Sequence, residues 1–431
     1  MVVKTSSAPT DAISYEDLYA RWERSNWRAT EIDFSQDAID WRERLTAEQR
    51  RSALWPYALF FHGEDSVADN LSPYIDAAPL EEQKYFLTTQ QVDEARHAVF
   101  FKRFMHEVVG AGDGTMAGGL RATSDQITWG HRQVFSRLDR MADELRRDRS
   151  RVKLAEAVTL YHVVVEASLA QPGQHMIERY LEAYDVLPGF REGMRNVSLD
   201  EQRHIGFGVK LLADLYRADP QPIQDAIVGL IKEVLPWTAA VAKPPGWDRS
   251  YTECFGFTLE DLGEAGAASI EQKLRAIGLP IDDIPGFPMP MDLPPRERSL
   301  RGQKLLRAGL IGPGDEGVVQ DPEAIEIMFD TIRRGAITDG VRPGTTIQWD
   351  FVDAPPWHVV LGANGDSRAA AGRASDADLT LRCRFADWAD VMAGRRDPRA
   401  LMLRGRLRPR GSVRVLVAMP RVLVAMPRVF G

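Results

Sequence analysis

The same five-residue pattern, Asp-Glu-x-Arg-His, occurs twice in this chain, at 93–97 and at 200–204. Both copies lie in long stretches with apolar residues at three- and four-residue steps, a spacing that predicts helices. On a helix, a Glu and the His three positions later lie on one face, one turn apart, and can bind the same ion. Carboxylate and imidazole ligands together suit iron or manganese. The repeated pattern therefore predicts a metal site built by two helices.

Each copy lies within an apolar stripe of its helix, and two further predicted helices carry one carboxylate each in such a stripe. A lone Glu-x-x-His is commonly a solvated ion pair, but a carboxylate on an apolar face is costly unless it is paired or binds a metal. The order Glu, Glu-x-x-His, Glu, Glu-x-x-His is that of dinuclear carboxylate sites in four-helix bundles. We therefore predict six metal ligands, which are Glu64, Glu94, His97, Glu166, Glu201 and His204.

Three polar residues beside these ligands are candidates for a supporting role. Asp93 and Asp200 directly precede ligand glutamates, so they either orient the imidazoles of the site or remain solvated helix charges. His162 lies on the predicted face of Glu166 and is expected to support the site or to be a buried core residue.

Proline and glycine content separates the chain into three predicted parts. Residues 1–235 form a helical metal domain with an N-terminal arm, 236–321 a Pro/Gly-rich linker with short helices, and 322–431 a small α+β domain. In the α+β domain we expect helices at 323–334 and 387–393, and strands at 345–351, 357–361 and 377–383. The arginines at 404–410 and at 414 alternate as on the wet face of a strand. A tandem RVLVAMP repeat at 414–427 receives no role.

Composition narrows the cellular setting and the partners. The net charge is −8, and the larger part, residues 1–321, is the acidic one, which argues against nucleic acid as a partner. No stretch is long and apolar enough to span a membrane, and the N-terminus lacks a secretory h-region. The two cysteines, Cys254 and Cys383, cannot form a disulfide framework, so we expect a cytoplasmic protein.

From about Tyr15 to Leu215 the chain resembles the small subunit of ribonucleotide reductase, in the order of the six ligands and in the arm LYARWE at 18–23. Within that superfamily it is most similar to the ligand-binding oxidases, through the segments GEDSVA (63–68), YHVVVEASLA (161–170) and LPGFREGMRNVSLDEQRHIGFGV (187–209). The resemblance implies an all-α, ferritin-like four-helix bundle with a dinuclear metal site, and a homodimer.

The ligand-binding oxidases are known for a manganese/iron site, a bound long-chain fatty acid and a self-generated tyrosine–valine ether crosslink. The positions that match the crosslink partners are Val67 and Tyr161. The resemblance places manganese at Glu64, Glu94 and His97, and iron at Glu166, Glu201 and His204. It makes Mn/Fe or Fe/Fe the expected cofactor and dioxygen the co-substrate. The residues expected to line the ligand pocket are Phe101, Val165, Leu169 and Ala170.

Two departures from the reductase pattern bear on function. The radical tyrosine of many reductase subunits corresponds to Phe101, and the chain lacks the acidic, tyrosine-bearing tail that docks on the large subunit. Both argue against nucleotide reduction. Gln171-Pro172-Gly173 follows the third ligand helix turn and is expected to bend or stop a helix.

The stretch from Asp376 to Gly411 resembles the sterol carrier protein type-two fold, which implies lipid binding by the last domain; a dimerisation or lid domain without a ligand is the alternative. Our leading hypothesis is an oxygen-activating dinuclear oxidase that acts on a hydrophobic, fatty-acid-like ligand and draws electrons from an unidentified donor. The alternatives are a di-iron hydroxylase or N-oxygenase of a biosynthetic pathway, and a lipid carrier with a structural metal site.

Overall fold

The computed structural model describes residues 13–284, 286, 288–363, 365–424 and 426. The chain divides into two compact units. The first comprises the residues up to Ile231 with Val241–Ile281, and the second comprises Lys232–Ala240 with the residues from Asp282 onward. The three-part division of the sequence stays a prediction. The N-terminus, where no secretory signal is expected, lies outside the described residues, and so does part of the second RVLVAMP copy.

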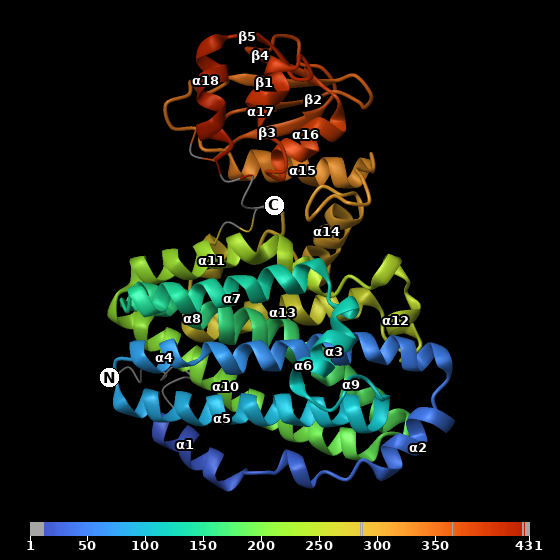
Figure 1. Ribbon diagram of the computed structural model, residues 1–431. Helices are drawn as coiled ribbons and strands as arrows, with labels where there is room; N and C mark the ends of the chain where they lie inside the picture. The colour runs from blue at the N-terminus through green and yellow to red at the C-terminus, as the bar shows by residue number, and fades with distance from the viewer. Residues whose placement is uncertain (1–12, 285, 287, 364, 425, 427–431) are drawn as a thin grey trace, which may run out of the picture. The chain divides into compact units, whose positions relative to one another are not determined.

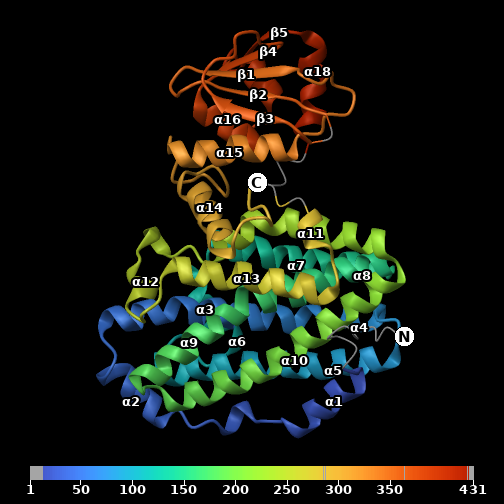
Figure 2. The ribbon, with the colours of Figure 1, turned by 180° about the vertical axis from the view of Figure 1, so that it is seen from behind.

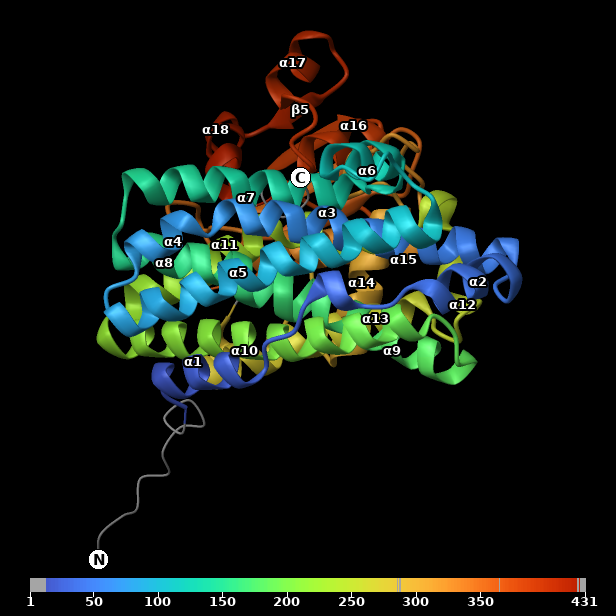
Figure 3. The ribbon, with the colours of Figure 1, turned by 60° about the horizontal axis from the view of Figure 1, so that its bottom comes forward.

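The first unit is helical, as predicted, and four long segments form its core (Figure 1): α3 (Ala47–Asn70), α5 (Glu81–Phe104), the continuous pair α8 (Arg151–Val158) and η5 (Thr159–Ala170), and α10 (Pro188–Ala218). Figure 3 shows α3, α5 and α10 running along one another, and Figure 2 shows α9 and α13 beside α10. The remaining longer helices are α1 (Tyr15–Arg24), α2 (Ser35–Glu43), α4 (Ser72–Ala77), α6 (Met116–Thr123), α7 (Trp129–Arg147), α9 (Gln171–Tyr184), α11 (Pro220–Val241) and α13 (Leu259–Ile277). Within the described part of the chain, every helix is too short or too polar to cross a membrane.

Local sequence explains where the ligand helices begin. Helix α3 starts with a capping box, in which the Thr46 side chain accepts from the Gln49 backbone and the Gln49 side chain accepts from the Thr46 backbone. Helix α5 has two glutamates in its first turn and Lys102 and Arg103 in its last, which complement the helix dipole. These start signals fix the register of the glutamates that follow.

Helix α10 is capped from a distance by the N-terminal arm. Its own N-cap residue, Leu187, provides no side-chain hydrogen bond. Instead the buried carboxylate of Asp37 accepts from the backbone N–H groups of Gly189 (2.9 Å) and Phe190 (2.7 Å), and Asp40 accepts from that of Leu187 (2.9 Å). Carboxylates at a helix N-terminus satisfy its free N–H groups and its dipole. The arm therefore anchors the helix that carries Glu201 and His204.

An aromatic cluster fills the part of the bundle where Phe34 and Trp41 of the arm pack against Phe104 of α5. Phe190 packs against Phe104 and Tyr57, with ring centroids 4.1 and 4.4 Å apart, and both Phe100 and Phe101 are fully buried beside them. Close-packed rings leave no room for water. This cluster keeps one side of the ligand helices dry.

The segment η5 is a π-helix of 12 residues. It continues directly into α9, with Pro172 in the first turn of the new helix. We expected Gln171-Pro172-Gly173 to bend or stop a helix. The π-helix does end at Ala170, but α9 begins at once with Gln171, because proline is tolerated in the first turn of a helix. Hydrogen bonds in a π-helix join residues five apart, and such segments are frequent at functional sites.

The second unit holds a five-stranded sheet in the order β3-β2-β1-β4-β5, in which β1 and β4 are parallel and the other pairs antiparallel. Its strands are β1 (Thr346–Phe351), β2 (Trp357–Val360), β3 (Arg368–Ala371), β4 (Leu379–Cys383) and β5 (Arg408–Gly411). Its helices are α14 (Pro295–Arg307), α15 (Pro322–Gly335), α16 (Phe385–Met392), α17 (Pro398–Leu403) and α18 (Val413–Val422). The predicted α+β class is confirmed, with its three strands and its helices at 323–334 and 387–393.

The core of this unit forms where α15 packs on the sheet: Phe329 stacks on Trp357 at 4.8 Å and meets Trp349 edge-on at 5.3 Å. The prediction for the arginine-rich segment is only partly right. Arg408 and Arg410 lie on β5, but Arg414 lies in α18, which Ser412 caps through the backbone N–H of Val415.

Candidate metal centre

The six predicted ligands converge in the first unit from the four core segments. Glu64 comes from α3, Glu94 and His97 from α5, Glu166 from the π-helix η5, and Glu201 and His204 from α10. Each of these residues is at most 6% exposed. The apolar stripes of four separate helices therefore bring these polar groups to one buried place.

The six residues form two overlapping groups whose ligand atoms lie within 4.8 Å of one another. One group contains Glu64 and His97 and the other contains Glu166 and His204, while Glu94 and Glu201 belong to both. Nδ1 of His97 lies 3.3 Å from Glu64 and 3.4 Å from Glu94, and Nδ1 of His204 lies 3.2 Å from Glu94. This arrangement provides two adjacent ion positions with two shared carboxylates.

Burial and mutual repulsion alter the acidity of these groups. Burial raises the pKa of the Glu64 carboxyl to about 8 and that of Glu166 well above its usual value. Burial also opposes ionisation of Glu94, but His204 and His97 outweigh it and hold the pKa of Glu94 well below its usual value. The pKa values of both histidines are raised, because the neighbouring carboxylates outweigh burial.

The residues present fit a pair of metal ions. The second carboxylate oxygens of Glu94, Glu166 and Glu201, and Nδ1 of His204, are buried without a hydrogen-bond partner. Buried polar atoms are rarely left unpaired. Four carboxylates in a dry core repel one another, whereas two divalent cations would balance their charge and bind the unpaired atoms. Oxygen and imidazole donors suit iron and manganese.

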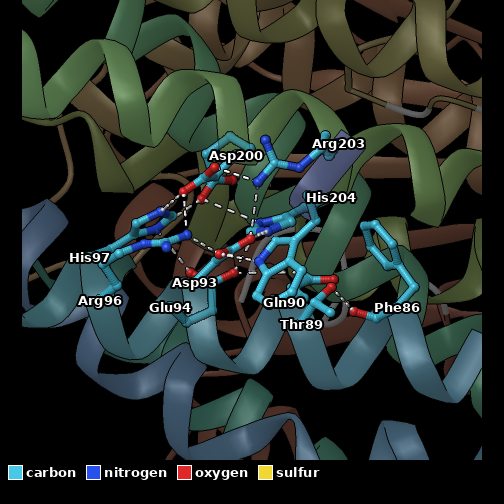
Figure 4. Close-up of polar contacts among 12 residues, drawn as sticks. Phe86, Thr89, Gln90, Asp93, Glu94, Arg96, His97, Asp200, Arg203 and His204 are labelled. Atoms are coloured by element: carbon cyan, nitrogen blue, oxygen red, sulfur yellow. Dashed lines mark hydrogen bonds and ion pairs between the residues drawn. The ribbon is translucent and has the colours of Figure 1, made fainter. Parts of the chain in front are cut away.

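Each aspartate of the repeated pattern contacts the histidine on the other helix (Figure 4). Oδ2 of Asp200, on α10, lies 3.0 Å from Nε2 of His97, on α5. Reciprocally, Oδ2 of Asp93, on α5, lies 3.1 Å from Nε2 of His204, on α10. Such contacts fix the ring orientation and leave Nδ1 of each imidazole to face the carboxylates.

Two indoles from the N-terminal arm complete this network, and the sequence analysis did not identify them. Trp22 Nε1 donates to Asp93 Oδ1 at 2.9 Å, and Trp27 Nε1 donates to Asp200 Oδ2 at 2.8 Å. Both aspartates also pair with Arg96 and Arg203. The aromatic composition of the arm was the available signal, but its partners lie 71 and 173 residues away.

Gln90 is a further residue of the site that the sequence left without a role. Its Nε2 donates to Glu166 Oε1 at 2.9 Å, and its Oε1 lies 3.1 Å from Nε2 of His162. Burial lowers the pKa of His162 to about 3. His162 fits against α10 because position 208 is glycine, where a Cβ would approach the His162 Cβ to 2.2 Å.

The other predicted site residues are placed as follows. The hydroxyl of Tyr161 donates to Glu94 Oε1 at 2.9 Å, and Val67 is buried on α3, one turn after Glu64. Phe101 lies in the aromatic cluster, where it stacks on Phe60. The pocket residues on η5 are Val165, which is buried, and Leu169 and Ala170, which are half-buried.

Comparison with known proteins gives two family matches. Residues 8–237 match the family described as ribonucleotide reductase, small chain, and residues 343–424 match the SCP-2 sterol transfer family. An R2-like ligand-binding oxidase from Sulfolobus acidocaldarius has 24% identity and a TM-score of 0.52, over 64% of this chain and 95% of that one. Two R2-like ligand-binding oxidase variants with an anaerobically reconstituted Mn/Fe cofactor have 25% identity and TM-scores of 0.52 and 0.53. The matches cover 63% of this chain and 94% and 93% of those chains.

Proposed function

The chain belongs to the ribonucleotide reductase small-chain family, and from this premise we propose that it is an oxygen-activating dinuclear metal oxidase acting on a hydrophobic ligand. The observation that carries the proposal is the pair of overlapping ligand groups that share Glu94 and Glu201 in a dry core. A non-haem dinuclear metal oxidoreductase needs such a site. The similarity to oxidases that carry a Mn/Fe cofactor supports the same class of enzyme.

Each residue then has a defined task. Glu64 and His97 would hold one ion and Glu166 and His204 the other, while Glu94 and Glu201, which belong to both groups, would contribute to each. Manganese with iron, or two irons, would supply the redox chemistry with dioxygen. By resemblance, manganese occupies the His97 side. Asp93 and Asp200 keep the imidazole rings oriented, so that Nδ1 of each is available to an ion.

The ligand is proposed to be apolar and fatty-acid-like. The match of residues 343–424 to a sterol transfer family supports a hydrophobic ligand, as does the name of the ligand-binding oxidases. The half-buried Leu169 and Ala170 on η5, with Phe101 and Val165, are the proposed lining of the pocket. The homodimer and the pocket both remain predictions.

We further propose an ether crosslink between Val67 and Tyr161. The Tyr161 hydroxyl already contacts Glu94 at 2.9 Å, so its proton can pass to a carboxylate of the site. Dioxygen serves as the oxidant, and the joined residues lose two hydrogen atoms. A peptide mass spectrum therefore distinguishes the crosslinked protein from the unmodified one.

The test is anaerobic reconstitution of the full chain with Mn²⁺ and Fe²⁺, followed by exposure to oxygen. Elemental mass spectrometry should find about one manganese and about one iron per chain. Oxygen should be consumed and the crosslink should form, and Glu201→Ala should abolish both. Two irons per chain would favour the biosynthetic hydroxylase. A protein that binds no metal would be a lipid carrier, and a crosslink that persists in Glu201→Ala would refute the ligand assignment.

A further inference from the structure

A cavity of about 620 Å³ lies between helices α1 and α5 of the first unit, which are neighbours in Figure 1. Its volume is in the range of sites for small organic molecules. Four aromatic side chains contribute to its wall. Its described lining residues are Tyr15, Glu16, Tyr19, Trp22, Glu82, Tyr85, Thr88, Thr89 and Val92.

The lining residues recur at helical spacing, so the cavity is formed by one face of α1 and one face of α5. Tyr15, Tyr19 and Trp22 follow one another at four and three positions on α1, so they share one helix face. On α5, Tyr85 and Val92 are seven positions apart, and they are 57% and 51% exposed. Large apolar groups that remain open to solvent in a hollow commonly mark a binding site.

The lining determines which ligands the cavity accepts. Its described charged residues are the carboxylates of Glu16 and Glu82, which repel phosphates and carboxylates. Lys210 lies over the ring of Tyr15 but pairs with Asp214 and is not a lining residue. A neutral aromatic molecule therefore fits, whereas a phosphate-bearing flavin or nicotinamide cofactor and a fatty acid do not.

The hydroxyl groups of two threonines in the cavity can accept hydrogen bonds from a neutral ring compound that carries O–H groups. Thr88 Oγ1 donates to the carbonyl of Lys84 at 2.8 Å, and Thr89 Oγ1 donates to that of Phe86 at 2.7 Å. Because each proton is already used, each hydroxyl oxygen is left as an acceptor. An O–H group of a quinol can donate to such an oxygen.

One wall of the cavity connects to the metal centre through two hydrogen bonds. Trp22 lines the cavity and donates from Nε1 to Asp93 Oδ1 at 2.9 Å. The other oxygen of Asp93 lies 3.1 Å from Nε2 of His204. Trp27 makes the corresponding link to Asp200, but it is covered by Arg96 and is not among the lining residues. Of these two indoles, Trp22 is the one that joins the cavity to a ligand histidine.

We propose that this cavity binds a neutral quinol as the electron donor of the enzyme, and that Trp22 and Asp93 carry its electrons toward His204. The proposal rests on the dinuclear oxidase function. The bound quinol loses two electrons and two protons and becomes the quinone. The protons pass to solvent, and the two electrons would pass singly to the pair of trivalent metal ions that the six ligands would hold, reducing each to the divalent state.

The first test measures binding without any metal. Menadiol, a neutral two-ring quinol kept reduced by excluding oxygen, is titrated into the metal-free full-length protein, and quenching of tryptophan fluorescence reports binding. Val92→Glu places a charge in the cavity and should raise the dissociation constant by about tenfold or more. Val152→Glu is the matched control, because Val152 is an exposed valine on α8 outside the cavity, and it should bind menadiol as the parent does.

Two results would overturn the cavity as the donor site. One is unchanged menadiol affinity in Val92→Glu. The other is failure of the parent protein to bind menadiol. If Val92→Glu then also changes the oligomeric mass measured by light scattering, another copy of this chain covers the cavity.

The second test addresses the route to the metal centre. Trp22→Phe keeps an aromatic ring but removes the N–H that contacts Asp93. Anaerobic reduction of the oxidised metals by menadiol, followed by stopped-flow absorbance, should slow about tenfold or more. Dithionite reduces the metals without using the cavity, so the ratio of the menadiol rate to the dithionite rate should fall about tenfold or more. An unchanged menadiol rate would refute the route. Metal content and oxygen uptake after dithionite reduction test the proposed function separately, so the two failures are distinguishable.

Discussion

The two copies of Asp-Glu-x-Arg-His, on α5 and on α10, contain the same chemistry but lie in different surroundings. In both, the histidine and glutamate face the shared site, and the aspartate reaches the histidine of the other helix. The position four residues after the histidine differs: it is Phe101 on α5 and Gly208 on α10. Phe101 belongs to the aromatic cluster, whereas Gly208 leaves room for His162. The repeat therefore defines four of the predicted ligands, and their neighbours make the surroundings of the two proposed ion positions unequal.

Glu64 and Glu166, the glutamates that lie outside the repeated pattern, also differ in their surroundings. Glu64 comes from a regular α-helix and contacts His97 at 3.3 Å. Glu166 comes from the π-helix and accepts a hydrogen bond from Gln90 at 2.9 Å. An amide donor and an imidazole tune a carboxylate differently. Two unlike metals, or two irons of unlike reactivity, are the expected result.

The largest expected effect tests which ligands are common to both sides. Glu94→Ala and Glu201→Ala should each empty both ion positions, because these carboxylates belong to both groups. Glu64→Ala and Glu166→Ala should each leave about one ion per chain. Elemental mass spectrometry of reconstituted protein measures the difference. If Glu94→Ala retained both ions, the shared position would be assigned wrongly.

The second prediction concerns Asp93 and Asp200, each replaced separately by asparagine. Asp93→Asn should lower the metal affinity on the His204 side by about 10- to 100-fold, and Asp200→Asn should lower that on the His97 side by the same factor. The reason is the loss of the carboxylate that orients the imidazole. Competition with a chelator of known affinity measures each site. The crossed arrangement fails if both variants weaken the same ion.

The third effect concerns the position that differs between the two copies. Gly208→Ala should lower the free energy of unfolding by about 1–3 kcal/mol, since its Cβ would lie 2.2 Å from that of His162. Gly206→Ala is the matched control on the same helix, where the nearest atom is 4.0 Å away. It should be neutral or stabilise by up to about 1 kcal/mol. Denaturant titration of both variants decides, and equal stabilities would contradict the packing argument.

The last prediction is a pH dependence of the metal-free protein. The pKa of Glu64 rises from its usual 4.5 to about 8 on folding. Its contribution to stability is therefore complete below about pH 4.5 and is lost as the pH rises through 8. Glu64→Gln, which stays neutral, should flatten the fall of the melting temperature over this range. An equal slope in the variant would show that other groups, such as Glu166 and the histidines, dominate.

The convergence of the six predicted ligand residues could be foreseen because they follow a strong local rule. Glu and His three positions apart on an apolar stripe leave few alternatives, and the structure brings all six side chains together. The strands at 346–351 and 379–383 were equally predictable from their alternation. Local periodicity sufficed in each case.

What the sequence did not reveal depends on contacts between distant residues. Trp27 and Asp200 are 173 residues apart in the sequence. Asp37 and the residues that it caps at the start of α10 are more than 150 residues apart. Nothing local indicates such a partner. Around Arg414, alternation suggested a strand, but Ser412 caps a helix, so a single capping residue outweighed the pattern.

The number of residues in the π-helix η5 determines the directions in which its side chains point. Residues five apart, such as Tyr161 and Glu166, lie roughly one turn apart in a π-helix, so both can reach Glu94 or its neighbours. In an α-helix each residue advances the direction of the side chain by about 100°. Deleting one residue between Thr159 and Ala170 would convert the local winding and rotate everything before or after it by about that angle. Substitutions in this segment are therefore easier to accommodate than any insertion or deletion.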